Sequence, residues 1–363
     1  MERRSFLKKA AVGTTGAAAT ALAAPAIAQS LPTIKWRLAS SFPKSLDTIY
    51  AAAEDLAKRV KGLTEGKFDI RVFAAGEVVP AFGVADAVQN GTVEMAHTAS
   101  YYFVGKNKTF CFDCAIPFGL NSRQQTAWMY HGGGLEATRA FFREFNIVNM
   151  PGGNTGTQMG GWWRKEIKTL DDLKGVKMRI PGFGGEVMSK LGVVPQAIPG
   201  GDIYPSLEKG TIDAAEWIGP YDDEKLGFFK VAPHYYYPGF WESSTQLSFY
   251  INAKEWEKLP QVYKEALEAA AAEAHVRMQA EYDAKNPKAL ASLLAKGAKL
   301  HRYPNDILQA AFVAAQDILA DENAKNPGFK KIYDQWSRFR NDSFQWFRVA
   351  EQGYASFAFS QKV

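Results

Sequence analysis

The chain has 363 residues, of which 47% are hydrophobic and 22% charged, so its composition is that of a folded globular protein and excludes a disordered or fibrous one. Its formal charge of +5 comes largely from residues 1–28, since the rest of the chain carries 39 basic and 37 acidic side chains. A mature charge near zero argues against a nucleic-acid or membrane-surface partner. The length exceeds that of one typical domain, so we expect two lobes.

Residues 1–28 have the layout of a bacterial export signal. Paired arginines and lysines precede a weakly apolar stretch at 10–24, and Ala26 and Ala28 supply the small side chains that come before a cleavage site. The order Arg-Arg-Ser-Phe-Leu-Lys is similar to the twin-arginine (Tat) type, and a general secretory signal is the alternative. The apolar stretch is too short to span a membrane. We therefore predict a mature protein that begins after Ala28 and lies in the periplasm.

The start of the mature chain alternates between strands and helices. Apolar and polar side chains alternate at 33–40 and again at 67–73, which is typical of strands with one buried face. Helical spacing follows at 47–60 and at 82–89, and 93–99 is predicted to be a third strand. Strands that alternate with helices predict βαβ units and a parallel or mixed sheet.

A similar pattern returns later, with predicted strands at 177–180 and 193–198 and predicted helices at 184–191 and 203–208. A short sequence pattern also occurs twice, once in each predicted lobe. Gly-Thr, a β-branched residue, an acid and small residues occur both at 90–97 and, 119 positions later, at 209–216. This is either chance similarity or a sign of two lobes wound alike.

Ligands of open α/β sheets bind beyond the carboxyl ends of strands. In the first copy of the repeat that end is Ser100-Tyr101-Tyr102, and in the second copy it is Glu216-Trp217. We expect both ends to face one cleft.

The chain becomes mainly helical after residue 253. We predict a helix at 261–285 that Asn286-Pro287 interrupts, a second helix at 304–321 and a last one at 330–357. The last helix is rich in aromatic residues. It packs either against the body of the protein or against another subunit.

The two cysteines, Cys111 and Cys114, have the C-x-x-C spacing of redox motifs. An apolar run with a proline surrounds them, which favours a local disulfide or a buried pair of thiols over redox chemistry. One such pair is too small to form a structural zinc site, which needs four ligands.

The sequence lacks the common enzyme motifs G-x-S-x-G, H-E-x-x-H and the P-loop lysine. No two of its five histidines lie close to each other in the sequence. We therefore expect a binding protein and no catalytic residues. A periplasmic enzyme that acts on small carboxylic acids is the alternative.

Arg179 is a candidate ligand-binding residue at the end of a predicted strand, on the face opposite Met178 and Ile180. By spacing alone it is either a solvated strand arginine or a guanidinium that holds a ligand carboxylate through two parallel hydrogen bonds.

Two acids beside tryptophans, Glu216 and Glu242, are candidate cation ligands. They are either surface acids next to core rings or, with an amide oxygen from Gln158, a site for a hard cation such as Na⁺ or Ca²⁺. Spacing does not choose between these readings.

Several segments resemble the solute receptors of TRAP (tripartite ATP-independent periplasmic) transporters. GDIYPSLEKGTIDAAEW at 201–217 is similar to the signature segment of that family, and LDDLKGVKMR at 170–179 to its arginine strand. EWIGP at 216–220 and YPGFWE at 237–242 resemble the subgroup that binds α-keto acids. The resemblance covers essentially the whole mature chain.

The resemblance implies an α/β periplasmic binding protein with two lobes, mixed sheets, hinge strands and a long C-terminal helical tail. The expected division is lobe I at 29–152, lobe II at 153–240, and a hinge strand with a return to lobe I and helices at 241–328. The remaining residues, 329–363, form the C-terminal helix, which mediates dimerisation in the subgroup.

The resemblance also implies the ligands and the residues that bind them. Arg179 binds the carboxylate of a small 2-oxo acid such as pyruvate, and further candidate contacts to that acid are Tyr101, Asn154, Gln158 and Trp217. A bound cation, with Na⁺ favoured and Ca²⁺ the alternative, touches the same ligand. It is held by four positions: Gln158, Glu216, Trp217 through its main-chain carbonyl, and Glu242.

Further partners follow from the family. The receptor delivers its ligand to membrane permease subunits that are driven by an ion gradient without an ATPase, and it forms a homodimer. We expect no nucleic-acid partner. The sequence does not determine the chain length of the ligand or the identity of the cation.

Overall fold

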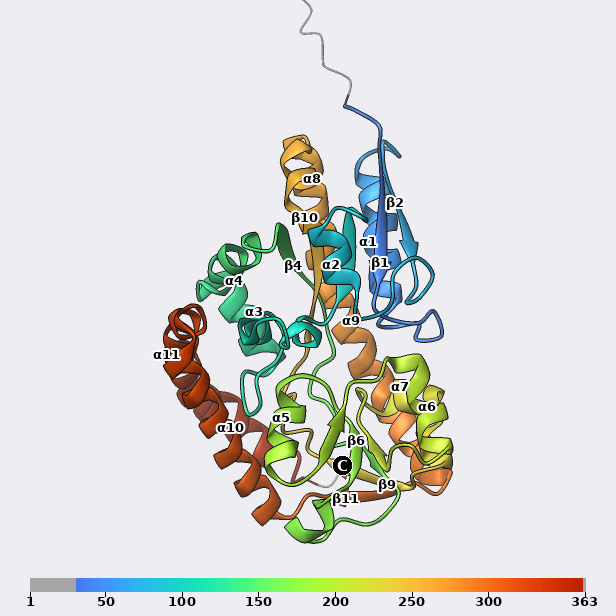
Figure 1. The fold of residues 1–363 in the computed structure, drawn as a ribbon, viewed down its shortest axis with the longest axis vertical. Coiled ribbons are helices and arrows are strands. Elements are labelled where there is room, and N and C mark those ends of the chain that lie inside the picture. Colours follow the sequence, from blue (N-terminus) through green and yellow to red (C-terminus); the bar gives the residue numbers. More distant parts are fainter. Residues whose placement is uncertain (1–30, 362–363) are drawn as a thin grey trace, which may run out of the picture. The chain divides into compact units, whose positions relative to one another are not determined.

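Two β-sheets organise the described part of the chain, residues 31–361 of the computed structural model (Figure 1). The predicted export signal and its cleavage site lie outside those residues. Within them, the first sheet has five strands in the order β2-β1-β3-β10-β4. β10 runs antiparallel to its two neighbours, β3 and β4, whereas β1 runs parallel to β2 and β3, so the sheet is mixed, as predicted. The strands are β1 (Ile34–Ser40), β2 (Phe68–Phe73), β3 (Met95–Thr98), β4 (Ile147–Asn154) and β10 (Gln246–Asn252).

The second sheet has six strands within the described residues, in the order β11-β9-β5-β8-β6-β7. It is mixed as well, because β5 runs antiparallel to β8 and β9. The strands are β5 (Trp162–Trp163), β6 (Lys177–Arg179), β7 (Val194–Gln196), β8 (Ala214–Ala215), β9 (His234–Tyr237) and β11 (Lys299–Arg302).

The sequence repeat corresponds to a structural repeat. β3 lies between the parallel strand β1 and the antiparallel strand β10, and β8 lies in the same way between β6 and β5. A helix precedes each of the two strands, α2 (Val84–Gln89) in one case and α6 (Gly200–Glu208) in the other. The two sheets are therefore wound alike around these strands, as the second of the two alternatives predicts.

Helices cover both faces of the sheets. Side chains of a strand alternate between faces, so in β10 Leu247 and Phe249 join one buried apolar cluster and Tyr250 joins the other. The first part of the chain supplies α1 (Ala51–Leu63), α3 (Ser122–His131), α4 (Gly134–Arg143) and the short helices η1 (Ser100–Phe103) and η2 (Lys108–Asp113). Later segments supply α5 (Gly182–Lys190), α7 (Pro220–Leu226), α8 (Ala253–Lys258), η3 (Leu170–Leu173) and η4 (Phe228–Lys230).

The predicted interruption of a helix at Pro287 is wrong. Helix α9 runs without a break from Gln261 to Ala295. A proline inside a helix removes one hydrogen bond. Here buried residues on both sides of it, Tyr282 and Leu293 among them, keep the helix packed against the body, where α9 contacts α1, β4 and α7.

The predicted segment 241–328 contributes to both sheets. β10 joins the first sheet, as expected of a strand that returns to lobe I, whereas β11 joins the second. Sequence periodicity does not reveal this crossing, because it does not show which neighbour an edge strand pairs with. The lobe boundaries themselves remain a prediction.

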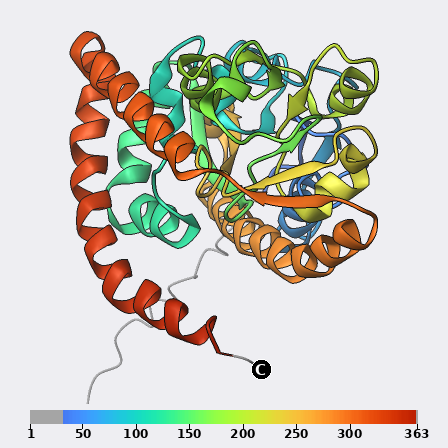
Figure 2. The same cartoon turned by 90° about the horizontal axis from the view of Figure 1, so that it is seen from below.

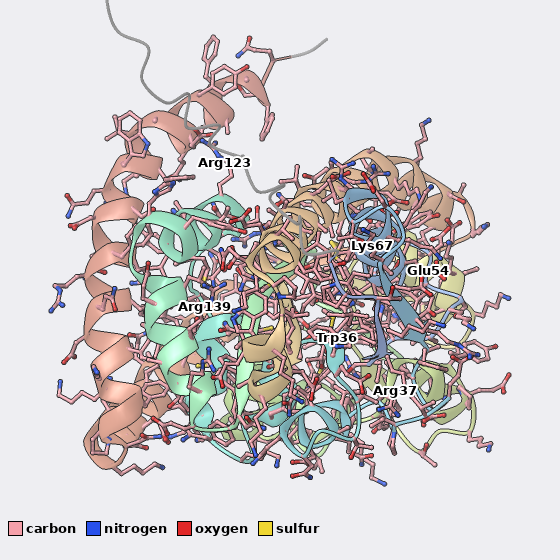
Figure 3. All side chains as sticks on the ribbon, turned by 90° about the horizontal axis from the view of Figure 1, so that it is seen from above. Trp36, Arg37, Glu54, Lys67, Arg123 and Arg139 are labelled. Atoms are coloured by element: carbon pink, nitrogen blue, oxygen red, sulfur yellow. The ribbon has the colours of Figure 1, made fainter. Side chains whose placement is uncertain are left out.

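The C-terminal helices form a curved tail that flanks the body (Figure 2). Helix α10 (Asn305–Lys325) packs on α5, and α11 (Pro327–Phe347) packs on η2, α3 and α4. A π-helical turn, η5 (Arg348–Gln352), and α12 (Gly353–Ala358) follow. Arg123 of α3, labelled in Figure 3, holds this end of the tail. It pairs with Glu351 at 2.8 Å, and its guanidinium lies over the ring of Phe347.

The aromatic residues of the tail have two different environments. Phe329 and Trp336, in the first half of α11, are buried core residues. Beyond them the tail exposes a row of large apolar side chains, of which between 63% and 87% is accessible: Trp346, Val349, Tyr354, Phe357 and Phe359. The first half of α11 therefore packs against the body, as one alternative predicted, whereas packing of the exposed part against another subunit stays a prediction.

The two cysteines are buried free thiols, so the local-disulfide alternative is wrong and the buried pair is confirmed. Cys111 lies in η2 and Cys114 directly follows it, and the two side chains belong to different core clusters. Burial raises the pKa of both thiols, which keeps them protonated and unreactive.

Candidate functional site

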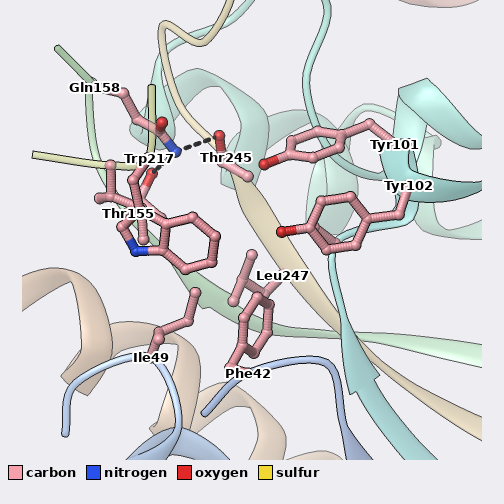
Figure 4. A pocket seen from close by; sticks show the side chains of 11 residues that line it. Phe42, Ile49, Tyr101, Tyr102, Thr155, Gln158, Trp217, Thr245 and Leu247 are labelled. Carbon is pink, nitrogen blue, oxygen red and sulfur yellow. Dashed lines mark hydrogen bonds between the residues drawn. The ribbon is translucent and has the colours of Figure 1, made fainter. Parts of the chain in front are cut away.

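A narrow pocket lies where segments from both sheets meet, with about 220 Å³ of space that no atoms fill, part of it open to solvent (Figure 4). The predicted strand ends do face one cleft, because Tyr101 and Tyr102 after β3 and Trp217 after β8 all line this pocket. The crossing connections from β4 to β5 and from β9 to β10 supply the other polar residues. The remaining lining residues are Phe42, Ile49, Ala99, Thr155, Gln158, Ile218, Thr245 and Leu247.

Arg179 ends β6 and is only 1% exposed, so the reading as a solvated strand arginine is wrong. Its Nε donates to the carbonyl of Ile198 at 3.0 Å. Its Nη1 donates to the carbonyl of Glu216 at 2.8 Å and to the Glu216 carboxylate. Only Nη2 is buried without a partner. In this arrangement one nitrogen, and not a pair, is free to meet a ligand.

Glu216 and Glu242 are also buried, at 0% and 3% exposure, so the reading as surface acids is wrong for both. Burial raises the pKa of Glu216 well above its usual value, and Glu242 raises it further, whereas Arg179 opposes the shift. Burial likewise raises the pKa of Glu242 to about 7, against the hydrogen bond from Thr245. Two buried acids that repel each other are costly unless a cation joins them.

Gln158 lies beside Glu242. The two residues are joined through the backbone, since the Gln158 N–H donates to the Glu242 carbonyl at 3.2 Å. The Gln158 amide nitrogen donates to the hydroxyls of Thr155 at 3.2 Å and Thr245 at 2.9 Å (Figure 4). Thr245 in turn donates to a carboxylate oxygen of Glu242 at 2.5 Å. These bonds leave the amide oxygen Oε1 of Gln158 buried and without a donor.

Asn154 and Trp217 complete the predicted set. Asn154 ends β4, and its Oδ1 accepts from the Gly156 N–H at 2.9 Å, which leaves Nδ2 buried without an acceptor. The Arg179 guanidinium lies 5.0 Å from the centre of the Trp217 ring. The Trp217 indole N–H donates to Asp222 at 3.3 Å.

The unpaired atoms fit a cation and a carboxylate. Oε2 of Glu216 and Oε1 of Gln158 are buried oxygens without donors, and Nη2 of Arg179 and Nδ2 of Asn154 are buried donors without acceptors. Buried polar groups are normally paired. Among residues 31–361 no three His, Cys, Asp or Glu side chains come together to hold a metal ion. Glu216 and Glu242 are only two carboxylates, but together with the Gln158 amide oxygen they are the type of oxygen ligand that a hard cation prefers.

Sequence reasoning missed the apolar lining and two polar positions. Phe42 and Ile49 lie on the loop between β1 and α1, and Leu247 is in β10. No motif marks them, because ordinary core residues have the same letters. Thr245 and Asp222 could have been noticed as polar residues close to Glu242 and Trp217, but only the structure shows what they contact.

The family model for the bacterial extracellular solute-binding proteins of family 7, called DctP, matches residues 39–326. A monocarboxylate 2-oxoacid-binding periplasmic protein from Nostoc is 50% identical over the full length of both chains. No helix of the described residues is long and apolar enough to cross a membrane.

Solved structures of similar proteins agree with this family match. A TRAP solute-binding protein from Bordetella bronchiseptica, a dimer with calcium and picolinate in one site, is 55% identical, with a TM-score of 0.90 over 91% of this chain and 98% of that one. A TRAP protein from Pseudoalteromonas atlantica with sodium and pyruvate is 38% identical, with a TM-score of 0.87 over 91% and 100%. The expected fold is confirmed. This chain belongs to the DctP family of periplasmic solute-binding proteins of TRAP transporters, and it is a receptor and not an enzyme.

Proposed function

We propose that this protein captures small 2-oxo monocarboxylates such as pyruvate, together with a hard cation, and delivers them to a TRAP permease. The observation that carries this function is the set of four unpaired buried polar atoms on Arg179, Asn154, Gln158 and Glu216. Two of them are donors that a carboxylate can accept from, and two are oxygens that a cation can bind, so a 2-oxo acid with a bound cation satisfies all four together.

Each polar residue has a distinct role in this proposal. Nη2 of Arg179 and Nδ2 of Asn154 donate to the ligand carboxylate, and the buried hydroxyl of Tyr101 contacts the ligand beside them. The cation supplies positive charge that neutralises the two acids and polarises the ligand oxygens. It is held by Glu216, Glu242, the Gln158 amide oxygen and the main-chain carbonyl of Trp217.

Glu216 also bonds to Arg179 through its second carboxylate oxygen. A cation that draws this carboxylate toward itself weakens that bond and leaves Nη1 available to the ligand. Binding of the cation and binding of the 2-oxo acid should therefore strengthen each other, as linked equilibria require.

The rest of the lining favours a short apolar tail. Phe42, Ile49, Ala99 and Leu247 supply carbon surface, and none of the pocket's lining residues is a lysine, an arginine or a histidine. A second carboxylate at the far end of a ligand would lie against this surface without a counter-ion, which is unfavourable. The pocket thus suits monocarboxylates.

The test is calorimetric titration of the purified protein with pyruvate, first after removal of metal ions and then with added Na⁺ or Ca²⁺. We expect the affinity for pyruvate to rise more than about tenfold when one of the cations is added. Disturbing a metal site typically changes affinity or activity by a factor of this size. Equal affinity under all conditions would contradict the cation site. Recovery of unchanged pyruvate after incubation distinguishes the receptor from an enzyme.

We also propose that the exposed apolar row of the tail joins two copies of this chain. Trp346, Tyr354 and Phe357 would otherwise each present most of a large apolar side chain to water. Substitution of Phe357 by Glu should give a monomer in size-exclusion chromatography with light scattering. Val262, in the first turn of α9, is 44% exposed and provides the matched control, and Val262→Glu should leave the dimer intact. A monomeric wild-type protein would refute the proposal.

A further inference from the structure

A cluster of charged residues joins the two sides of the pocket next to its lining. Asp47 lies on the loop between β1 and α1, and Tyr221 and Lys225 lie on α7, which follows β8. The Asp47 carboxylate pairs with Lys225 Nζ and accepts a hydrogen bond from the Tyr221 hydroxyl at 3.1 Å. Lys225 Nζ also lies 4.4 Å from the centre of the Tyr221 ring.

Helix α9 also contacts this cluster. Nζ of its Lys285 lies 4.4 Å from the centre of the same Tyr221 ring, and the Asn286 side chain accepts from the Tyr221 N–H at 3.0 Å. On the loop, Thr48 donates to Glu281 of α9 at 3.3 Å. The loop and α7 are thus both held on α9, and Asp47 connects them to each other.

The same two segments carry opposite walls of the pocket. Phe42 and Ile49 flank Asp47 on the loop, and Trp217 and Ile218 directly precede α7. Phe42 is 1% exposed and Trp217 is 4% exposed, and their ring centres lie 6.5 Å apart, so the two walls meet with little water between them. Separation of the loop from the α7 segment opens the pocket on this side. That movement breaks the contacts of Asp47 with Tyr221 and Lys225.

We propose that Asp47, Tyr221 and Lys225 form an electrostatic latch that positions the two walls of the pocket and sets the rate of ligand release without touching the ligand. The proposal rests on the proposed function only for the identity of the ligand. Because Asp47 and Lys225 keep 53% and 31% of their side-chain surface exposed, salt should weaken the latch.

The first experiment measures pyruvate release by stopped-flow tryptophan fluorescence. Lys225→Met should raise the release rate about two- to fivefold, the range measured for exposed ion pairs, with little change in the association rate. Lys225→Arg, which keeps the charge, should restore a rate near that of the wild type. The increase should shrink in high salt.

The matched control is Lys44→Met. Lys44 lies on the same loop and pairs with Glu77 at 2.9 Å, but both partners belong to the first-sheet side, so this pair does not cross the pocket. Its loss should not alter release. Equal release rates for the wild type, Lys225→Met and Lys44→Met would overturn the latch.

The second experiment needs no ligand. Spin labels on Lys35→Cys in β1 and Lys190→Cys in α5 report the distance between the two sides, since the native cysteines are buried. Lys225→Met should shift this distance distribution in ligand-free protein relative to both the wild type and Lys44→Met, and an unchanged distribution would overturn the latch. A wild-type protein that fails to bind pyruvate contradicts the proposed function, while these distances still decide the latch.

Discussion

The two walls of the pocket differ in chemistry. On the second-sheet side, Arg179 and Glu216 are buried and paired with each other behind Trp217, which lines the pocket. The first-sheet side contributes the carbon surface of Phe42 and Ile49. In the proposed function, the second-sheet side therefore recognises charge and the first-sheet side recognises the size of an apolar tail. Substitutions on the charged wall should abolish binding, and substitutions on the apolar wall should change which ligand is preferred.

The largest effect is expected from Arg179→Met. This change removes the guanidinium whose unpaired Nη2 is proposed to meet the ligand carboxylate, and it breaks the buried ion pair with Glu216, which costs about 3–5 kcal/mol. We expect pyruvate binding to disappear in calorimetry while circular dichroism still shows a folded protein. Arg37→Met is the control, because Arg37 is an exposed strand arginine that pairs with Glu94. Native affinity of Arg179→Met would contradict the assigned role.

A smaller effect is expected on the apolar wall. Ile49→Ala removes carbon surface from the pocket and makes room for a longer tail. The ratio of affinities for 2-oxohexanoate and pyruvate should rise about tenfold, because differences of a few methylene groups in an apolar pocket are worth about 1–3 kcal/mol. Competition titrations measure this ratio. Ile34→Ala, in β1 and away from the pocket lining, should leave it unchanged.

The smallest effect concerns stability outside the pocket. Burial raises the pKa of Asp113 to about 6, although hydrogen bonds from Ser100 and Asn149 oppose the shift. A raised pKa in the folded state means that this group stabilises the fold below its unfolded pKa of about 4 and loses that contribution as pH rises through 6.

Asp113→Asn should therefore reduce the fall in melting temperature between pH 4.5 and pH 7, measured by calorimetry against the wild type. Asp86→Asn, on an exposed side chain, is the control. Identical pH dependence in Asp113→Asn and the wild type would show that Asp113 titrates in the fold as it does in the unfolded chain.

Much of the fold was predictable from local patterns. The predicted strands at 33–40, 67–73 and 93–99 correspond to β1, β2 and β3, and the repeat placed Tyr101 and Trp217 at one cleft. Local patterns failed where packing decides the outcome. Pro287 stays inside α9 because buried residues on both sides of it keep the helix packed against the body. β11 pairs with β9, a strand that is far from it in the sequence, so no local pattern indicates this pairing.

By itself, the sequence determined the two-sheet architecture, the family and the residues that carry charge, because alternation, helical spacing and motif letters are local properties of the chain. Only the tertiary structure decided how those charges are used. Sequence spacing left open whether Arg179, Glu216 and Glu242 lie at the surface, and the structure buries all three. There Arg179 and Glu242 both influence the pKa of Glu216. The structure also places Ile49 and Leu247 in the pocket and Asp47 against Lys225, contacts between segments far apart in the chain that no spacing could reveal.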